Sequence, residues 1–370
     1  MQQGPGRLRS VAALALAALA AAAIAACAAP AAHRERRHHA RAHAEKRAEP
    51  DRFAVGAIAF AHYCALCHGP NAEGYAADHA PSLRSATFLA TASDDYLVRS
   101  IREGRPGTAM AAYGRARGGP LDDAEIRAIV TFVREGGPAR VALSPAPVSG
   151  DASRGEVVYA STCKPCHGTK TDRGEVALQL SNPELLADAS DAFLQYAVVH
   201  GRPGTPMPSF AGSLSGEQID DVVVLLRSWA RPTPHRNRPE PPPLGPIVLN
   251  PNGKAPEFNL RQDRFVPIAD VKRALDEKRR MVIIDARAGS DYLASHVPGA
   301  ISVPYYAFER LDEMPKDGTW ILAYCACPHH ASGAVVDELR KRGYPRTAIL
   351  DEGILVWLKR GYPSQHGAPE

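Results

Sequence analysis

The chain of 370 residues is poor in aromatic residues, in methionine and in net charge. Aromatic residues make up only 6%, the methionines number five, and the formal net charge is +4 at pH 7. So small a charge gives no case for nucleic-acid binding, and the sequence contains no recognisable module of that kind. The low aromatic content suits small helical domains whose centre is filled by a bound group. At this length, two or three domains are expected rather than one.

The seven cysteines leave no obvious disulfide framework, because each has a place in another pattern. Cys27 ends an apolar leader segment. Cys325 and Cys327 form a close pair near the C-terminus. The remaining four belong to two C-x-x-C-H motifs, at residues 64–68 and 163–167.

C-x-x-C-H is the attachment signature of c-type haem, in which both thiols bond to the porphyrin and the histidine ligates the iron. The candidates are Cys64, Cys67 and His68 in the first copy, and Cys163, Cys166 and His167 in the second. A second axial ligand follows in each copy, since Met110 and Met207 end two matching segments of the form G-R-P-G-T-x-M. Two of five methionines at the same place in two such segments indicate a function for both.

Thiol–disulfide exchange and zinc binding are the alternatives for this motif. A thioredoxin-like motif would need a βαβ setting, which the flanking sequence lacks, and zinc would need four ligands where only three soft ones lie close. His200, just before the second methionine segment, either competes for iron or lies at the surface. Two copies of the signature in an exported chain favour haem.

The two motifs lie in an internal repeat, formed by residues 53–136 and 151–231. A glycine and an aromatic residue precede each signature at the same spacing. These residues are Gly56 with Phe60 in the first unit and Gly155 with Tyr159 in the second.

Each unit is predicted to close on an amphipathic helix that begins with a capping box. The boxes are Asp122 with Glu125 and Ser215 with Gln218. The aromatic residue before each signature is expected to pack on this closing helix, through Phe132 in the first unit and Trp229 in the second.

Residues 53–231 therefore resemble a tandem of small class I cytochrome c domains with His/Met ligation. The resemblance implies two all-α domains, each wrapped round one covalently bound haem c that carries one electron. The soft methionine sulfur raises the haem potential, and filling both axial positions favours electron transfer over substrate binding. Redox proteins of a respiratory chain are the implied partners. The first unit departs from the usual Met-Pro, because Ala111 follows Met110 whereas Pro208 follows Met207.

Residues 1–27 predict an export signal with a positive start, an apolar run too short for a membrane span, and no charged stop after it. The run ends Ile24-Ala25-Ala26-Cys27, which resembles the lipobox of bacterial lipoproteins, where the cysteine is lipidated. A plain signal-peptidase site beside Ala28 and Ala29 is the alternative. We expect a periplasmic protein, anchored to the membrane by lipid at Cys27 or secreted to the periplasm without it.

Two segments of biased amino-acid composition lie before and after the pair of predicted cytochrome domains. Residues 28–50 are rich in Ala, Arg and His, and predict a basic tether near an anionic membrane. The alternative is a metal-binding tract, formed by His33, His38, His39 and His43. Residues 232–261 predict a semi-rigid linker, with nine prolines between residues 232 and 256.

Residues 262–365 change character, because buried strand patterns alternate with helical ones. Strands are predicted at residues 281–285, 320–324 and 348–350, and helices at 271–275 and 334–341. Such alternation is typical of an α/β domain with a parallel sheet. Cys325 follows one of these strands, which is where parallel sheets place ligand sites.

This segment resembles the rhodanese family. The resemblance is carried by Asp285-Ala286-Arg287, Asp291-Tyr292, His296 to Ile301, Pro304, Leu350, Gly353, Trp357 and Gly361-Tyr362-Pro363. It implies that the Cys325 thiolate takes up a sulfane sulfur as a persulfide from a small anion such as thiosulfate. Backbone N–H groups of the following loop would hold that anion.

The loop departs from the family at two positions. Pro328, in place of glycine, has no N–H to donate. His330, in place of the frequent arginine, supplies positive charge only when protonated, so sulfur transfer should fall as the pH rises. Cys327 could resolve the persulfide or form a disulfide with Cys325, and both cysteines could bind a soft metal together with His329 and His330.

The expected fold is therefore multidomain, with two all-α cytochrome c domains followed by one α/β rhodanese-like domain. Two functions are consistent with it. The first is a dihaem electron-transfer protein that is coupled to sulfane-sulfur handling at Cys325. The second is a pure electron carrier of a respiratory chain, whose rhodanese-like domain is inactive and serves docking or metal or redox sensing.

Overall fold

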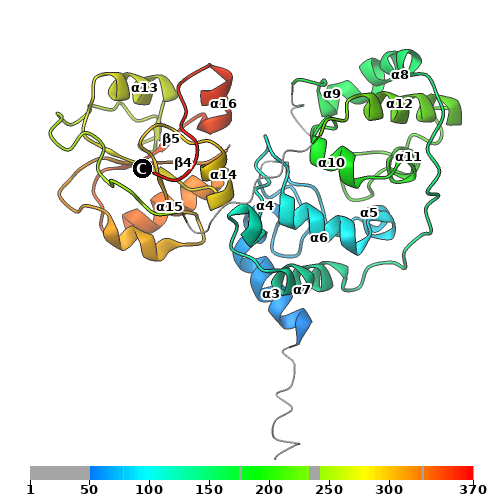
Figure 1. Cartoon of the computed structure of the whole chain (residues 1–370), viewed down its shortest axis with the longest axis horizontal. Helices are drawn as coiled ribbons and strands as arrows, with labels where there is room; N and C mark the ends of the chain where they lie inside the picture. Colours follow the sequence, from blue (N-terminus) through cyan, green and yellow to red (C-terminus); the bar gives the residue numbers. More distant parts are fainter. Residues whose placement is uncertain are drawn as a thin grey trace, which may run out of the picture. The chain divides into compact units, whose positions relative to one another are not determined.

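The computed structural model describes residues 51–77, 79–172, 174, 177–232, 242–326 and 329–369. Within these residues two helical domains come first and one α/β domain follows (Figure 1). The predictions for the leader with Cys27, the basic tract, much of the Pro-rich linker, Cys327 and Pro328 lie outside the described residues. None of the helices in the described part is long and apolar enough to cross a membrane.

The two helical domains contain matching α-helices in the same order and differ in their short turns. The first has α3 Arg52–Tyr63, α4 Ala65–His68, α5 Ala86–Thr91, α6 Asp94–Glu103, η1 Arg115–Arg117 and α7 Asp123–Arg134. The second has α8 Ala152–Val158, a π-helical turn η2 Tyr159–Cys163, α9 Lys164–His167, α10 Pro183–Asp188, α11 Asp191–His200 and α12 Gly216–Ser228. The short 3-10 turn η1 has no counterpart in the second domain.

A glycine brings the opening and closing helices of each domain into close contact, α3 with α7 and α8 with α12. A Cβ atom added at Gly56 would overlap the carbonyl oxygen of Ala128 on α7. One added at Gly155 would overlap the carbonyl oxygen of Asp221 on α12. The repeated glycines are therefore required by the helix crossing, because any side chain would push the two helices apart.

The repeated aromatic residues pack as predicted. The ring of Phe60 lies 4.9 Å from that of Phe132, centroid to centroid, and the ring of Tyr159 lies 5.0 Å from that of Trp229. Each pair stands next to the glycine crossing and joins the first turn before the signature to the end of the closing helix. The helix that leads into each signature is thus packed against the closing helix of its domain.

Replacing Gly155 by alanine tests this crossing. We expect the melting temperature of the second helical domain to fall by roughly 10 °C, because overpacking costs on the order of 1–3 kcal/mol in a domain of this size. Gly216 is the matched control, since it opens α12 with no atom within 4 Å of an added Cβ. Thermal unfolding of both variants measures the effect, and equal melting temperatures would contradict the close contact.

Both predicted capping boxes are present, at the start of α7 and of α12. An arginine at the far end of each closing helix makes a contact that the sequence did not reveal. Arg134 donates to the carbonyl oxygens of Leu89 and Ala92 and to the carboxylate of Asp94. Arg227 does the same for Leu186, Ala189 and Asp191 in the second domain. Each guanidinium therefore ties the closing helix to the link between two preceding helices.

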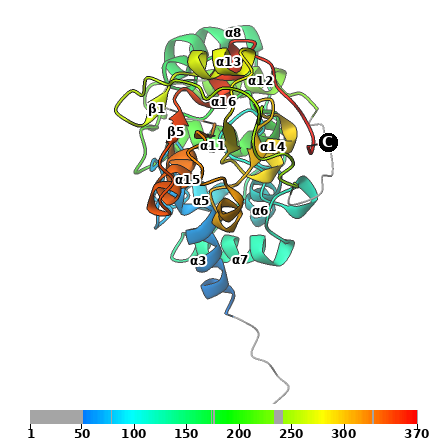
Figure 2. The same ribbon diagram turned by 90° about the vertical axis from the view of Figure 1, so that its left-hand side faces the viewer.

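The C-terminal domain contains a parallel five-stranded sheet with strand order β1-β5-β4-β2-β3. Figure 1 labels its strands β4 and β5, and Figure 2 labels β1 and β5. The elements of the domain are β1 Phe265–Val266, α13 Ile268–Asp276, β2 Val282–Asp285, α14 Gly289–Ala294, β3 Ile301–Ser302, η3 Phe308–Glu313, β4 Ile321–Tyr324, α15 His330–Lys341, β5 Thr347–Leu350 and α16 Gly353–Lys359. The three predicted strands are confirmed. The edge strands β1 and β3 were missed because two residues are too few for a pattern.

Helices cover both faces of this sheet. The core that contains α13 and α16 includes the fully buried Trp357, and a separate core contains α15 and η3. All four residues of β2, β4 and β5 are buried, as central strands of a parallel sheet require. The carboxyl end of β4, where Cys325 lies, is therefore held between two packed layers.

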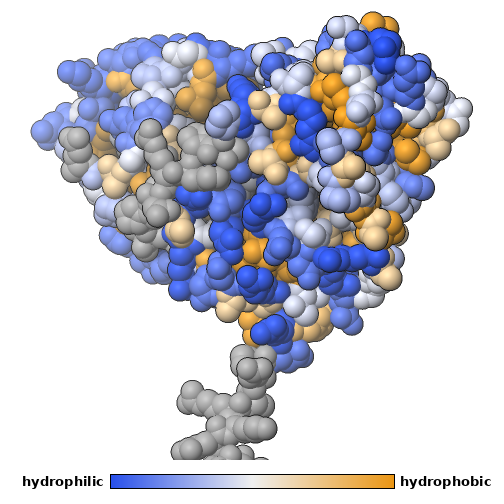
Figure 3. Space-filling model, turned by 45° about the vertical axis from the view of Figure 1, so that its right-hand side comes forward, coloured by the Kyte–Doolittle hydropathy of each residue, from blue (hydrophilic) through white to orange (hydrophobic). Residues whose placement is uncertain are grey.

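Some hydrophobic side chains are left at the surface. Figure 3 shows them gathered in patches between hydrophilic residues on one face of the molecule. Two of the exposed residues, Ile58 on α3 and Val157 on α8, occupy the same position in the repeat and are 73% and 71% exposed. Because both opening helices leave this position exposed, burial within a domain does not explain the hydrophobic residue there.

Candidate functional site

Each C-x-x-C-H motif forms a single helical turn, α4 or α9, that ends at its histidine. Both histidines are buried, with His68 8% and His167 9% exposed. The Nδ1 atom of His68 lies 3.0 Å from the carbonyl oxygen of Pro81, and that of His167 lies 2.8 Å from the carbonyl oxygen of Leu178. A carbonyl oxygen only accepts, so Nδ1 carries the proton and Nε2 keeps its lone pair.

Burial also favours the neutral form of both imidazole rings. It lowers the pKa of His68 and of His167 from the ordinary value, and the hydrogen bond from each ring opposes this shift. Neutral imidazole with a fixed tautomer is the form that ligates a metal.

One continuous cavity collects the predicted haem residues of both domains. It is lined by Cys64, Cys67, His68, Met110, Cys163, Cys166, His167 and Met207, with mostly apolar side chains between them. Each domain supplies two thiols, one buried imidazole and one thioether to this cavity. The set fits a c-type haem in each domain, because thioether attachment and His/Met ligation use these groups.

The methionine segments are closed loops that a threonine holds in shape. The N–H of Arg105 donates to the carbonyl oxygen of Met110 at 2.7 Å, and the hydroxyl of Thr108 donates to the carbonyl oxygen of Arg105 at 2.7 Å. The N–H of Met110 returns a hydrogen bond to the same hydroxyl at 3.1 Å. The second domain repeats all three bonds with Arg202, Thr205 and Met207. The loop is therefore the same whether or not proline follows the methionine.

The first glycine of each segment is required by its backbone. Gly104 has φ +67° and Gly201 has φ +62°, which is the left-handed region that favours glycine. A Cβ atom at Gly104 would also lie 2.5 Å from the carbonyl carbon of Ala111. This close approach turns the chain back after Met110 and explains why the glycine and the methionine have the same spacing in both copies.

The same segments join the two helical domains. The hydroxyl of Thr87 donates to the carbonyl oxygen of Gly201 at 2.7 Å, and the side-chain amide of Asn182 donates to the carbonyl oxygen of Pro106 at 3.0 Å. Arg105 reaches Asp188 of the second domain at 3.5 Å. Each methionine loop is thus bonded to the other domain, which brings the two ligand sets to one cavity.

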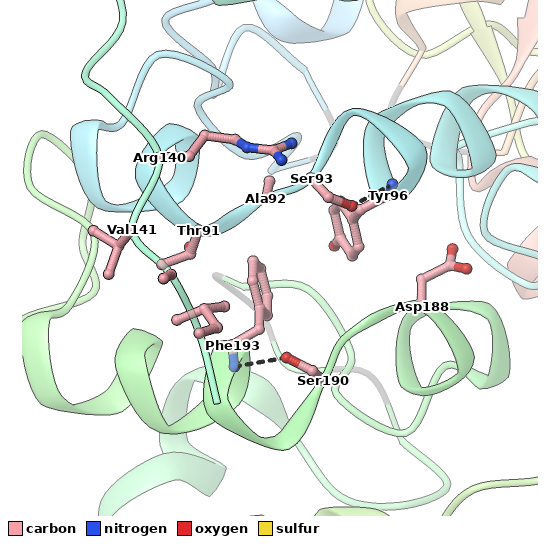
Figure 4. Close-up of a pocket in the computed structure, with 11 residues that line it drawn as sticks. Thr91, Ala92, Ser93, Tyr96, Arg140, Val141, Asp188, Ser190 and Phe193 are labelled. Carbon is pink, nitrogen blue, oxygen red and sulfur yellow. Dashed lines mark hydrogen bonds between the residues drawn. The ribbon is translucent and has the colours of Figure 1, made fainter. Parts of the chain in front are cut away.

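Aromatic rings and caps meet in the centre of this contact. Figure 4 shows Ser93 and Tyr96 facing Ser190 and Phe193, which occupy the same positions in the repeat. The rings of Tyr96 and Phe193 lie 5.1 Å apart, and the guanidinium of Arg202 lies over Phe193 at 5.2 Å. Burial lowers the pKa of Arg202 to about 10, so the group remains charged at neutral pH.

Cys325 lies directly after β4 and is only 5% exposed. Its Sγ lies 3.3 Å from the hydroxyl oxygen of Ser332, in the first turn of α15. Gly353 fixes the other side, because at φ +67° its added Cβ would lie 2.8 Å from the carbonyl oxygen of Cys325. The N–H of Ile354 donates to that same carbonyl at 3.0 Å. The thiol is therefore held between the start of α15 and the start of α16.

The two histidines of the loop are placed differently. His329 has φ +84°, and its Nε2 lies 3.1 Å from a carboxylate oxygen of Asp351 at the end of β5. His330 is the first residue of α15, and its Nδ1 is buried without a hydrogen-bond partner. Among the described residues, no three His, Cys, Asp or Glu side chains are grouped to hold a metal ion. Cys327 lies outside them, so the predicted soft-metal cluster remains a prediction.

Asp285 and Arg287 form a buried ion pair beneath this site. The guanidinium of Arg287 donates to Asp285 at 2.6 Å and to the carbonyl oxygen of Ser295 at 2.6 Å. The hydroxyl of Tyr324, the last residue of β4, donates to Asp285 at 2.8 Å. Burial alone would lower the pKa of Arg287, but Asp285 and Asp291 raise it, so the guanidinium stays charged. The pair braces the carboxyl ends of β2 and β4.

Comparisons with known proteins match each part of the chain. The family model described as cytochrome c oxidase, cbb3-type, subunit III matches residues 51–133 and 150–226. The model of the rhodanese-like domain matches residues 268–360. The matched ranges correspond to the two helical domains and the α/β domain described above.

Individual proteins are similar to parts of this chain. The cbb3-type cytochrome c oxidase subunit FixP of Bradyrhizobium sp. (strain ORS 278) is 31% identical over 186 residues, which are 47% of this chain and 60% of that relative. Cytochrome c6 of Thermosynechococcus vestitus is 32% identical over 97 residues, which are 24% of this chain and 85% of that protein. Among solved structures, thiosulfate sulfurtransferase from Pseudomonas aeruginosa is 28% identical, with a TM-score of 0.27 over 29% of this chain and 21% of that one.

The chain thus spans less than two thirds of the FixP relative but most of the length of a single-domain cytochrome. Two domains with the haem signature, the buried neutral histidine and the methionine loop precede a parallel α/β domain with a cysteine after its central strand. The chain belongs to the c-type cytochromes, with two cytochrome c domains of the cbb3-oxidase subunit III type and a C-terminal rhodanese-like domain.

Proposed function

We propose that this protein is an exported dihaem c-type cytochrome that transfers electrons and handles sulfane sulfur at Cys325. The observation that carries the proposal is the cavity to which both domains contribute a complete set of thiols, imidazole and thioether. Haem c supplies reversible one-electron chemistry when bound. Cys64, Cys67, His68 and Met110 would hold one haem, and Cys163, Cys166, His167 and Met207 the other.

The protein's own residues would tune this chemistry. The carbonyl oxygens of Pro81 and Leu178 hold the histidine rings in one orientation, and the apolar cavity wall excludes water. The loops that Thr108 and Thr205 close hold Met110 and Met207 at the cavity that the two histidines also line. Thioether ligation and an apolar surrounding both favour the reduced, less charged state and so raise the potential.

At the third domain, the Cys325 thiolate would attack the outer sulfur of thiosulfate. A new S–S bond forms to Cys325, the original S–S bond breaks, and sulfite leaves with the bonding electron pair. The persulfide sulfur then passes to a nucleophilic acceptor such as a thiol, which regenerates the Cys325 thiolate. Sulfur transfer of this kind is redox-neutral and releases no electrons. Electrons would come from a separate oxidation, in which the Cys325 persulfide and an acceptor thiol join as a trisulfide and release two protons and two electrons. These electrons would leave one at a time through the cytochrome c domains to a respiratory partner, which acts as the oxidant.

The alternative function is electron transfer alone, with the rhodanese-like domain kept for docking or sensing. The small exposure of Cys325 and the binding of His329 by Asp351 favour this alternative. The unpartnered Nδ1 of His330 beside the Cys325 loop favours sulfur chemistry. A thiosulfate:cyanide sulfur-transfer assay on the intact protein and on Cys325→Ala separates the two functions.

Substitution of His330 tests its role in sulfur transfer. We expect His330→Ala to lower the rate of sulfur transfer and His330→Arg to retain it, since arginine carries a positive charge that attracts an anionic substrate. Equal rates in His330→Ala and the unmodified protein would show that His330 contributes no charge to the reaction.

We further propose that the protein works at the periplasmic side of a membrane, with redox proteins of a respiratory chain as partners. The export signal and the similarity to an oxidase subunit named FixP support this location. Lipid on Cys27 would anchor the protein. Mass spectrometry of the mature protein tests the anchor: a diacylated N-terminal Cys27 is expected, and an unmodified chain that begins after Ala29 would refute it.

A further inference from the structure

The rhodanese-like domain contacts the first haem domain, and it does so at the haem signature. Helix α15, which follows the Cys325 loop, contacts helix α4 of the first signature. The hydroxyl of Ser290 on α14 donates to the carbonyl oxygen of Ala112 at 2.7 Å. A Cβ atom added at Gly289 would lie 3.0 Å from the carbonyl oxygen of Gly118.

Three tyrosines form a directed chain of hydrogen bonds across this contact. The hydroxyl of Tyr305, in the rhodanese-like domain, donates to the carbonyl oxygen of Tyr63. It also lies 2.7 Å from the hydroxyl of Tyr113 in the first haem domain. A hydroxyl has one proton, and that of Tyr305 is used on Tyr63. Tyr113 is therefore the donor to Tyr305, and the order is Tyr113, Tyr305, Tyr63.

The groups in this chain stay protonated at physiological pH. Burial raises the pKa of Tyr113 and of Tyr305 well above the ordinary value. The ring of Tyr306 adds an edge contact with Tyr63 at 5.1 Å. Neutral hydroxyls in a region of low dielectric form strong hydrogen bonds, and removal of one leaves its neighbours unpaired.

The series of hydrogen bonds from Tyr113 through Tyr305 to Tyr63 reaches both sides of the first haem site. Tyr63 immediately precedes Cys64, so its carbonyl belongs to the peptide that leads into the signature. Tyr113 lines the same cavity as Met110 and follows it by one short turn. A residue of the rhodanese-like domain thus binds both the thiol side and the methionine side of one site.

The second haem domain lacks this arrangement. Phe210 occupies the position of Tyr113, with the same backbone bond to the preceding helix: Tyr113 N–H donates to Ile101 and Phe210 N–H donates to Val198. Phe210 has no hydroxyl to donate. The repeat therefore provides a natural comparison in which only the domain that contacts Tyr305 carries the tyrosine.

The geometry points to Tyr305 as a positioning residue for the first haem site, through which the rhodanese-like domain is docked on the first haem domain and acts on that haem rather than on the second. This inference rests on the proposed haem binding. It identifies the first haem as the one next to the sulfur site, and it places the second at the far end of the electron path.

A Tyr305→Phe variant of the intact, haem-loaded protein tests the inference by redox titration. We expect the titration wave of one haem to shift while the other stays in place, because only one signature loses its hydrogen bonds. Tyr306→Phe is the matched control, since it keeps the ring contact with Tyr63 and leaves both bonds of the chain intact. We expect no shift in the control.

Removal of one signature at a time assigns the wave. In a Cys163→Ala/Cys166→Ala background the Tyr305→Phe shift should persist, and in a Cys64→Ala/Cys67→Ala background it should vanish. A shift of both waves, a shift of the second haem alone, or no shift would overturn the inference.

Hydrogen–deuterium exchange gives a readout that does not depend on haem. In Tyr305→Phe the amides of residues 63–68 should exchange faster on the order of tenfold, which corresponds to the loss of about one hydrogen bond. The amides of residues 162–167 should keep their rates. Unchanged exchange at residues 63–68 would overturn the docking through Tyr305. If exchange is faster but the protein binds no haem, the docking stands and the proposed haem function is refuted.

Discussion

Replacing Cys64 and Cys67 by alanine is expected to halve the covalently bound haem, from two per chain to one. The reason is that each domain holds its own complete set of attachment and axial residues. The haem that remains should keep its His167 and Met207 ligands and its own potential. The haem content is measured per protein as pyridine haemochrome after denaturation, which retains only covalently attached haem.

The converse variant, Cys163→Ala/Cys166→Ala, is the matched control and should also retain one haem. A variant with alanine at all four of these cysteine positions should retain no covalently bound haem. A protein that retains two haems after either pair is removed, or that loses both at once, would contradict the assignment of one haem to each domain.

Replacing Asp285 by asparagine is expected to destabilise the rhodanese-like domain by about 3–5 kcal/mol, because it leaves the buried guanidinium of Arg287 without its nearest counter-ion. The amide also keeps only one of the two oxygens that accept from Arg287 and from the Tyr324 hydroxyl at the end of β4, so hydrogen bonds are lost as well. Chemical denaturation followed by a probe in this domain measures the loss. Sulfur transfer at Cys325 should fall with it, because β4 carries the thiol.

Asp337→Asn provides the comparison within the same domain. Asp337 is paired with Arg264 at 2.7 Å, but its side chain is 62% exposed. Loss of such a surface pair should change the stability by no more than about 0.5 kcal/mol. Equal effects of the two substitutions would mean that the buried pair does not brace the sheet.

Much of the helical part could be predicted because its information is local. The aromatic residue one turn before each signature predicted the packing on the closing helix, through Phe60 and Tyr159, whereas the close crossing at Gly56 and Gly155 was not predicted. The capping boxes at Asp122 and Ser215 were visible for the same reason, since their hydrogen bonds join residues three positions apart. Two copies of each pattern gave a comparison within one chain that a single copy would not have offered.

Contacts between distant segments could not be predicted in this way. Arg134 and Arg227 bind carbonyl oxygens some 40 residues earlier in the chain, and no periodic pattern marks such a bond. Tyr113 and Tyr305 are 192 positions apart. Their hydroxyl groups had no signal in the sequence except that Phe210 stands where the first domain has Tyr113.

The Cys325 site could be predicted in part. Its place after a central strand followed from the alternation of strands and helices, and the structure agrees. The separate roles of the two histidines did not follow, because His329 turns to Asp351 through a left-handed backbone conformation while His330 begins α15. The two neighbouring residues are both histidines, and only their different backbone conformations give them separate roles.

The central claim is that sulfur chemistry at Cys325 feeds the haem pair. Stopped-flow reduction of the oxidised protein by a persulfide donor, compared between the wild type and Cys325→Ala, tests it most directly. We expect haem reduction in the variant to be slower by on the order of tenfold or more, while its haem content and potentials are unchanged. Equal reduction rates in the two proteins would contradict the claim and leave electron transfer alone as the function.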